Sequence, residues 1–377
     1  MSALRVLQVS AFFPAHGGGI EVVAGALAAR LHGAGVELHW MAGGPREEWP
    51  PAWPGATLDT QTAWDPLERH LGLPFPIWSP VSLAKLWQRV GENEVVHVHD
   101  FLYMPTLAAM LFAALRGRPV VLTQHIGKIP YRSPWARSLL ALLNRSLGAF
   151  VLRRVAQAVF VGLPVQRYFE GLVRFRTAPV LIPNGVDHAL FHPAAVAAPG
   201  ELRLLFVGRF VEKKGVPLLL DCLDLPYAVW TFVGSGPLQP PTSSKLRLAG
   251  RLDPAQVAQQ LRESDLLVLP STGEGFPLVV QEALACGTPV LVSTEVFEAF
   301  PSIDEHCVFH VELRGANPAQ ALRERLLQLV AEPARLRQAR AAATALARQW
   351  DWAATVQRYA DLYRGLVKAA PKQPSSP

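Results

Sequence analysis

Two glutamates have spacing and surroundings that suit the binding of a sugar nucleotide. Glu274 and Glu282 are separated by seven residues in the segment EGFPLVVQEALACGTPV, which lies between two predicted buried strands. The segment predicts a loop followed by a helix, with Pro277 at the first helical position. A helix N-terminus binds diphosphate through unpaired N–H groups, and Gly275 allows a ligand close to the backbone. The alternative is that Glu274 is a first-turn acid and Glu282 a solvated helix residue, but the helix around Glu282 is apolar.

A second cluster supplies positive charge. Arg209 and Lys214 follow a predicted strand in VGRFVEKKG, with Lys213 as an adjacent candidate. Two cations that converge on one spot can neutralise a leaving diphosphate without a metal ion. Taken alone, such a loop more often faces solvent. Of the two lysines, Lys214 fits the phosphate-binding role better than Lys213, because it directly precedes Gly215.

Histidines and glycines in the first half of the chain form further candidates. His97 and His99 alternate along one predicted strand and therefore share a face, Asp100 closes that strand, and His125 ends the next. A histidine at a strand end is more often structural. These histidines lack a third ligand at metal-binding spacing, so no metal site is predicted. The turn HGGGIE over residues 16–21 is not a dinucleotide fingerprint, but its glycines can bring backbone amides close to an anion.

The elements that must position these residues alternate between strand and helix. Such alternation predicts an α/β protein with two doubly wound parallel sheets, and a chain of 377 residues accommodates two domains. We predict an N-terminal domain over residues 1–190, completed by a helix at about 352–368, and a C-terminal domain over 198–350. The linker is expected at 193–200, and a long loop from 45 to about 80. Ligands of such folds bind at the carboxyl ends of the strands, which here predicts a cleft between the domains.

The glutamate segment, with its flanking strands and Gly-Thr-Pro-Val turn, resembles the E-x7-E signature of the family-four retaining glycosyltransferases, also described as group 1. The resemblance implies a GT-B fold, in which two Rossmann-like domains face each other across a cleft. It also implies that Glu274 contacts the donor sugar and Glu282 the ribose. Backbone amides near Gly275, Phe276 and Leu278 would hold the sugar and the diphosphate.

The same resemblance assigns roles to residues outside that segment. Arg209 and Lys214 would bind the donor phosphates, and His125 would act with Glu274 as a catalytic residue at the donor sugar. Asp100 or His99 would position the acceptor hydroxyl. The remaining donor-binding positions are Gly18 and Gly19 in the glycine-rich loop and Leu252 near the nucleobase. One departure is the segment TEVFEAF at 294–300, which replaces a common Gly-Gly turn near the donor.

The implied activity is transfer of a sugar from a nucleotide-diphosphate-sugar with retention of configuration and without metal or cofactor. The donor would bind mainly to the C-terminal domain, and the acceptor, a glycan or lipid-linked glycan of the cell envelope, to the N-terminal one. Two alternatives are a sugar-nucleotide epimerase of similar fold and a non-catalytic nucleotide-sugar-binding or membrane scaffold. The donor base, the sugar and the acceptor stay open.

Charge is concentrated in one region. Residues 116–176 contain eleven Lys or Arg and one acid, Glu170, whereas the whole chain carries a formal charge of +6. A basic surface predicts an anionic partner. Residues 133–157 mix Arg with Leu, Phe and Trp at partly helical spacing, which suits an anionic membrane; the alternative is a core-facing helix with a solvated Arg face. Nucleic acid fits less well, because no aromatic stacking platform is evident. No membrane span or signal peptide is predicted, and three unpaired cysteines favour the cytoplasm, with or without peripheral attachment to the inner face of its membrane.

Overall fold

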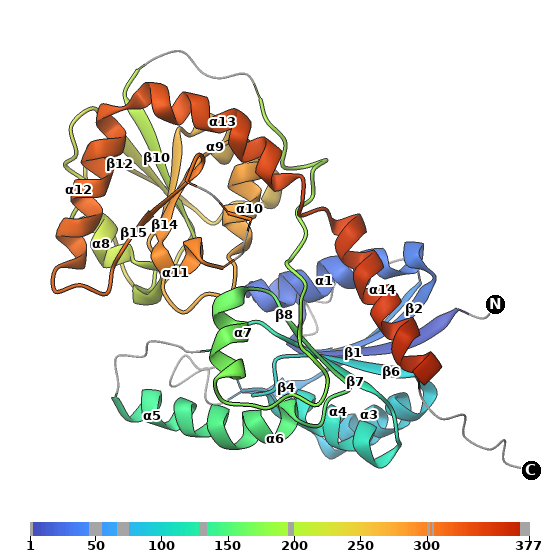
Figure 1. Cartoon of the computed structure of the whole chain (residues 1–377). Coiled ribbons are helices and arrows are strands. Elements are labelled where there is room, and N and C mark those ends of the chain that lie inside the picture. The colour runs from blue at the N-terminus through green and yellow to red at the C-terminus, as the bar shows by residue number, and fades with distance from the viewer. Residues whose placement is uncertain are drawn as a thin grey trace, which may run out of the picture.

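A computed structural model describes residues 3–44, 55–65, 75–127, 134–194, 200–299, 302–303 and 305–369. It contains two parallel-sheet α/β domains, so the predicted fold class is confirmed (Figure 1). The tail after residue 369, part of the predicted linker and six residues of the basic segment (128–133) lie outside the described residues.

The N-terminal domain has a seven-stranded sheet with the order β3-β2-β1-β6-β7-β8-β9, in which all neighbours are parallel. A short antiparallel pair, β4 and β5, lies outside it. The strands are β1 Leu4–Phe12, β2 Val36–Gly43, β3 Ala56–Gln61, β4 Ala63–Trp64, β5 Ile77–Trp78, β6 Val95–His99, β7 Val120–Gln124, β8 Gln157–Phe160 and β9 Val180–Leu181. The helices are α1 Gly19–Leu31, α3 Pro80–Glu92, α4 Met104–Leu115, α5 Pro134–Leu143, α6 Ala149–Leu152 and α7 Leu163–Glu170, with a π-helical turn at Asn144–Gly148 between α5 and α6.

The C-terminal domain has a six-stranded parallel sheet with the order β12-β11-β10-β13-β14-β15. Its strands are β10 Leu202–Val207, β11 Ala228–Val233, β12 Leu246–Gly250, β13 Leu266–Leu269, β14 Val290–Ser293 and β15 Val308–Val311. Its helices are α8 Val216–Leu220, α9 Pro254–Glu263, α10 Leu278–Ala285, α11 Thr294–Phe297, α12 Pro318–Ala331 and α13 Pro333–Ala347.

In both sheets the order of the strands reverses at the first strand of the domain. In the first sheet β1 lies between β2 and β6, and in the second β10 lies between β11 and β13. Loops that leave adjacent strands toward opposite faces open a crevice at such a switch point. Gly18 and Asp100 follow β1 and β6, and Arg209 and Glu274 follow β10 and β13, at the carboxyl ends of strands where ligands of doubly wound folds bind. His125 and Leu252 follow β7 and β12, farther from the switch points.

The last helix, α14 Trp352–Ala369, returns from the C-terminal domain to the first one. Its buried Tyr359 and Tyr363 share one apolar cluster with residues of α1 and β2. The chain passes between the domains twice, near residue 186 and near residue 350. These two segments are hydrogen-bonded to each other, because the Val186 N–H donates to the Trp350 carbonyl at 2.7 Å. Arg30 of α1 forms an ion pair with Asp187 at 2.8 Å and ties this double crossing to the N-terminal domain.

Several local predictions were wrong. The expected loop from 45 to about 80 contains β3, β4, β5 and the start of α3, and the sequence reading missed β8, β9 and β15. These strands have two to six residues, too few to show a periodicity of their own. Pro277 is the N-cap of α10 in extended conformation, and the helix begins at Leu278. Helix α9 is capped by Asp253, whose side chain accepts the Gln256 N–H. Within the described residues, no helix is long and apolar enough to cross a membrane.

Candidate active site

The loop between β13 and α10, residues 270–277, carries Glu274 and is held by neighbouring strand ends. The Thr272 N–H donates to the Lys213 carbonyl at 2.9 Å. The Ser293 hydroxyl at the end of β14 donates to the Ser271 carbonyl at 2.7 Å. The loop is therefore fixed to the backbone of the basic cluster itself and to the end of the strand that follows α10.

An ion pair joins the two predicted clusters of the C-terminal domain. The Lys214 ammonium lies 2.9 Å from the Glu274 carboxylate, and that of Lys213 lies 4.0 Å away. Burial raises the pKa of Glu274, but the charges of Lys214 and Lys213 outweigh it and hold this pKa below the ordinary value. Burial lowers the pKa of Lys213, and the neighbouring charge of Arg209 adds to that effect. The side chain of Arg209 is exposed at the end of β10. Glu274 and Lys214 thus meet in the loop before α10, and the charge of Arg209 acts on the adjacent Lys213.

The other donor-side residues divide into a carboxylate and a set of apolar residues. Glu282 lies within α10, where burial raises the pKa of its carboxyl to about 7. Phe276 is buried with its ring 5.2 Å from that of Trp350. Leu278 packs against the apolar core of the N-terminal domain, whereas Leu252 packs against that of its own domain. The side chains of Phe276, Leu278 and Leu252 are engaged in packing, so their contribution to binding would come from the backbone.

On the N-terminal side, His125 follows β7 and is almost fully buried. Its backbone N–H donates to an Asp100 carboxylate oxygen at 3.0 Å, and its Nε2 lies 3.0 Å from Nδ1 of His99. Burial lowers the pKa of His125 to about 3 and that of His99 well below its ordinary value. Both rings are therefore neutral at pH 7, and one donates a hydrogen bond to the other.

His99 lies beneath His125 rather than at a ligand-facing surface. It is fully buried, and its ring packs against that of His97 with centroids 4.4 Å apart. His97 is held by Tyr363 of α14, whose hydroxyl lies 2.8 Å from Nδ1. The prediction that His99 contacts the acceptor is therefore not supported by its position. Its contacts instead fix the orientation of His125.

Asp100 and Glu21 form a second acidic feature. Asp100 has a left-handed backbone with φ 57°, and burial, with the charge of Glu21 as a smaller cause, raises the pKa of its carboxyl to about 7. Glu21 is buried in the first turn of α1. A Cβ on Gly18 would lie 2.0 Å from a Glu21 carboxylate oxygen, whereas one on Gly19 would meet open space among the described residues. A side chain at position 18 would therefore displace the Glu21 carboxylate, and Glu21, the acid of HGGGIE, acts on the charge of Asp100, which the sequence alone did not indicate.

The two sides of the site meet backbone to backbone. A Cβ on Gly275 would lie 2.6 Å from the His125 carbonyl oxygen, and one on Gly162 would lie 2.2 Å from the Gly275 carbonyl oxygen. Beside this contact, the Leu163 N–H at the start of α7 donates to the Ala299 carbonyl at 2.7 Å. The structure therefore brings the Glu274 loop next to His125, and it does so through glycines that leave no space for a side chain.

Comparison with known proteins agrees with this architecture. Residues 17–190 match the family model of Glycosyltransferase Family 4, and residues 201–332 that of Glycosyl transferases group 1. The phosphatidyl-myo-inositol mannosyltransferase of Propionibacterium freudenreichii is 32% identical over 290 residues, which cover 72% of this chain and 70% of that enzyme. The chain belongs to the family-4 glycosyltransferases. Glycogen synthase of Mycobacterium tuberculosis is 27% identical over 419 residues, with 98% of each chain covered.

Solved structures of glycosyltransferase type share the same fold. Sucrose-phosphate synthase from Thermosynechococcus elongatus matches with a TM-score of 0.75 at 20% identity, over 97% of this chain and 100% of that one. Anabaena HepE in complex with UDP matches with a TM-score of 0.71 at 16% identity, over 96% of this chain and 100% of that one. This glycosyltransferase therefore has the GT-B fold.

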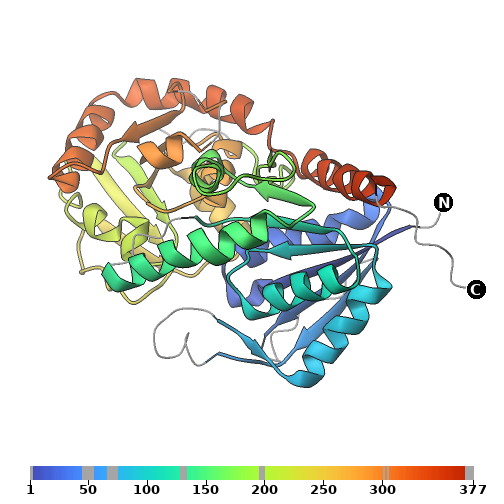
Figure 2. The same ribbon diagram turned by 60° about the horizontal axis from the view of Figure 1, so that its bottom comes forward.

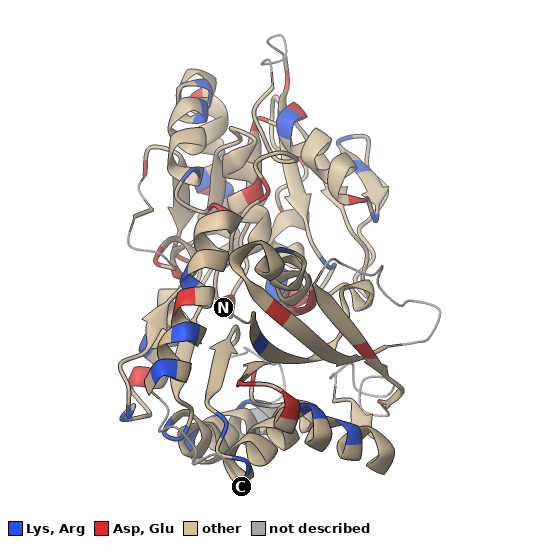
Figure 3. Cartoon of the chain, turned by 90° about the vertical axis from the view of Figure 1, so that its right-hand side faces the viewer, with Lys and Arg blue, Asp and Glu red and all other residues tan. Residues whose placement is uncertain are grey.

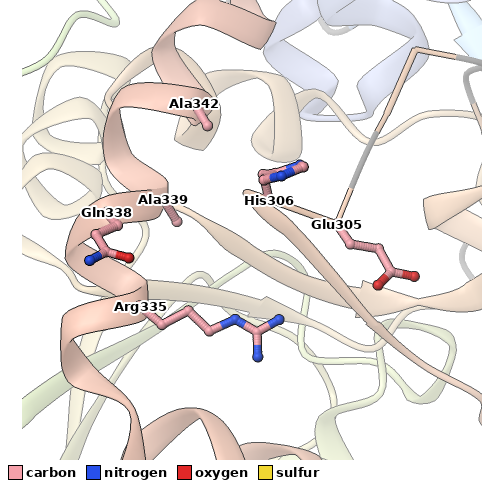
Figure 4. Close-up of a pocket in the computed structure, with 6 residues that line it drawn as sticks. All are labelled: Glu305, His306, Arg335, Gln338, Ala339 and Ala342. Carbon is pink, nitrogen blue, oxygen red and sulfur yellow. The ribbon is translucent and has the colours of Figure 1, made fainter.

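One surface pocket of this glycosyltransferase lies apart from the residues described above. It is lined from α13 and from the turn before β15 (Figure 4), by Glu305, His306, Arg335, Gln338, Ala339 and Ala342. None of the predicted site residues lines it. The described residues contain no group of three or more His, Cys, Asp or Glu side chains that could hold a metal ion.

Proposed function

We propose that this glycosyltransferase is a retaining, metal-independent enzyme that takes a nucleotide-diphosphate-sugar as donor. The proposal rests on the ion pair between Lys214 and Glu274, at 2.9 Å. The loop that carries Glu274 is in backbone contact with His125 through Gly275. Without donor the two charges neutralise each other. With donor bound, Lys214 would turn to the diphosphate and Glu274 would accept hydrogen bonds from sugar hydroxyls, so that neither buried charge is left unpaired.

The leaving diphosphate would be stabilised by fixed positive groups. Lys214, Arg209 and the first amides of α10 would converge on it, and such preorganised charge in a water-poor site is a large contribution to catalysis. Glu282 would accept hydrogen bonds from the ribose. His125 would contribute a neutral hydrogen bond at the donor sugar, since burial keeps its ring uncharged at pH 7.

Metal independence follows from the same assignment, because two side-chain cations take the place of a divalent ion at the phosphates. Transfer should persist at full rate in excess EDTA. A rate that depends on added Mg²⁺ or Mn²⁺ would refute this part of the proposal. Retention can be read from the product by NMR, from the configuration at the anomeric carbon.

Donor binding can be tested by thermal unfolding with UDP-glucose, GDP-mannose and ADP-glucose. A donor at 100 times its Kd should stabilise the fold by about 2.7 kcal/mol. We expect one of these donors to stabilise the protein, and the double variant Arg209→Ala, Lys214→Ala to abolish the shift. The control is Arg247→Ala, which removes an exposed cation on β12 of the same domain. A shift that survives in the double variant would place the donor elsewhere.

The acceptor side of the proposal concerns a membrane. The helices α5 and α6 with the π-helical turn run along the bottom of the molecule in Figure 1 and across its front in Figure 2. They carry exposed apolar side chains. Trp135, Leu139 and Leu142 are spaced four and three residues apart, so they share one helical face, and their exposed fractions are 64%, 45% and 61%. Exposed arginines flank these side chains. Figure 3 shows Lys and Arg, together with some Asp and Glu, at the lower end of the molecule.

Apolar side chains flanked by arginines suit the surface of an anionic membrane. The acceptor would then be a lipid or lipid-linked glycan, in keeping with the lipid in the name of the Propionibacterium relative. The protein should float with vesicles of phosphatidylglycerol and phosphatidylcholine but not of phosphatidylcholine alone. Leu139→Glu with Leu142→Glu should abolish flotation, whereas Leu327→Glu, at an exposed leucine of α12, should not. Equal flotation of both variants would contradict a membrane role for α5.

A further inference from the structure

The segment that replaces the family's common Gly-Gly turn makes contacts at both of its ends. It begins as the short helix α11, whose first turn is capped by Ser293, since the Ser293 hydroxyl accepts the Val296 N–H. The segment then continues to Ala299, which is fully buried. Figure 1 places α11 beside α7, where the two domains meet.

The first end holds the Glu274 loop. A carboxylate oxygen of Glu295 accepts the backbone N–H of Gly273 at 3.0 Å. Gly273 has φ +70°, a left-handed conformation that turns the chain just before Glu274. A hydrogen bond to a carboxylate is stronger than one between neutral groups. Glu295 therefore holds Gly273, whose turn sets the direction of the Glu274 side chain.

The second end contacts the N-terminal domain. The Ala299 carbonyl accepts the Leu163 N–H at 2.7 Å, beside the backbone contact between Gly162 and Gly275. One short segment thus contacts the loop that carries Glu274 and the first turn of α7. The position of the loop and the approach of the two domains are linked through the five residues from 295 to 299.

We infer that Glu295 is a positioning residue for the sugar part of the donor, which rests on the proposed role of Glu274 as the contact to the sugar. Glu295 acts through Gly273 and does not touch the nucleotide. Its loss should therefore weaken binding of the intact nucleotide-sugar more than binding of the free nucleoside diphosphate. A residue that merely stabilised the fold would change both affinities alike or neither.

The experiment compares four variants by isothermal titration with UDP-glucose, GDP-mannose and ADP-glucose and with UDP, GDP and ADP. Glu295→Ala removes the acceptor, and Glu295→Asp shortens the side chain by one carbon. Glu295→Gln keeps an amide oxygen at the same reach. Glu298→Ala is the matched control, because this exposed glutamate lies on the same segment.

We expect Glu295→Ala and Glu295→Asp to weaken the tightest-binding nucleotide-sugar by about 10-fold, the effect of one lost hydrogen bond to a charged group. The matching nucleoside diphosphate should change less than about 3-fold. Glu298→Ala should stay close to the wild type, and Glu295→Gln, which keeps a neutral acceptor, should fall between the wild type and Glu295→Ala. Thermal unfolding shows whether each variant is folded. If Glu295→Ala does not fold, Glu295→Asp takes its place in the comparison.

Three results would overturn the inference. They are a Glu295→Ala protein that binds the sugar nucleotide like Glu298→Ala, a parallel loss of both ligands, and a Glu295→Gln protein as weak as Glu295→Ala. A wild-type protein that binds none of the six nucleotides would refute the proposed function itself. Normal wild-type binding with an unaffected Glu295→Ala protein would refute only the role of Glu295.

Discussion

Gly162 offers a direct test of whether the observed contact between the domains is the catalytic arrangement. Its backbone is extended, with φ −154° and ψ 149°, so alanine can adopt the same conformation without strain. The added Cβ, however, would lie 2.2 Å from the Gly275 carbonyl oxygen in the other domain. Gly162→Ala should therefore leave each domain folded and obstruct only their approach.

The magnitude follows from the distances. Ordinary van der Waals contact begins at 3.4 Å, so the two backbones must separate by about 1.2 Å. A shift of that size along the neighbouring bond would lengthen the 2.7 Å hydrogen bond from Leu163 to Ala299 to about 3.9 Å, beyond hydrogen-bonding range. A misplacement of about 1 Å between reacting groups can reduce a rate by about 100-fold. We expect a fall of that order in kcat.

The assay measures release of nucleoside diphosphate from the preferred donor, together with its Kd and the thermal midpoint. The nucleoside diphosphate binds mainly to the C-terminal domain in the proposed function, so its Kd should change less than about 3-fold while kcat falls. The midpoint should move by no more than about 3 °C. Gly171→Ala is the control, since this residue at the other end of α7 has φ −70° and 3.5 Å of space for a Cβ.

A Gly162→Ala enzyme with the kcat of the wild type would refute the reasoning. It would mean that the chemical step does not need the backbone contact between Gly162 and Gly275. An equal loss in the Gly171→Ala enzyme would also contradict it, because that substitution meets no atom of the other domain at short range.

Three further predictions concern stability. Lys214→Ala should destabilise the fold by about 3 kcal/mol at pH 7, because the Glu274 carboxylate loses the cation 2.9 Å away. Lys213→Ala removes a cation 4.0 Å away and should destabilise the fold by a smaller amount. Because the lysines depress the pKa of the Glu274 carboxyl, the difference in unfolding free energy between the wild type and Lys214→Ala should shrink as the pH falls below the ordinary value of 4.5; a difference in urea unfolding that stays constant would contradict this. Burial raises the pKa of Glu282 to about 7, so this carboxyl should destabilise the wild type relative to Glu282→Gln by an amount that grows as the pH rises from 4.5 to 7; a difference between the two proteins in urea unfolding that stays constant over this range would refute it. Tyr363→Phe should cost about 1–3 kcal/mol in urea unfolding, because a fully buried imidazole loses its partner at 2.8 Å, and an unchanged midpoint would show that the bond adds no stability.

The local pattern of the sequence was sufficient for the class of the fold and the location of the site residues along it. Short runs rich in valine and leucine, such as VVHVH and LLVL, are followed by Asp100 and Pro270, a pattern typical of buried parallel strands that end in loops. Strands that alternate with helices then place every strand-end residue at one edge of a sheet. The positions of His125, Glu274 and Arg209 at strand ends follow from this rule alone.

The contacts between those residues could not be read from the sequence. Lys214 and Glu274 are far apart in the chain, and the partners His99 and His125 come from different strands. Such pairs depend on strand order, register and side-chain direction, which no local periodicity encodes. Equally, nothing near Gly162 indicates that its hydrogen faces a carbonyl group of the other domain.

Sequence by itself therefore determined the architecture, the family and the types of residue at the site, because helix and strand patterns and short motifs are local properties. Only the tertiary structure decided that His99 supports His125, that the Glu21 carboxylate lies against Gly18 and that Glu295 holds the Glu274 loop. These are relations between elements distant in the chain, and they exist only once burial and packing have brought the elements together.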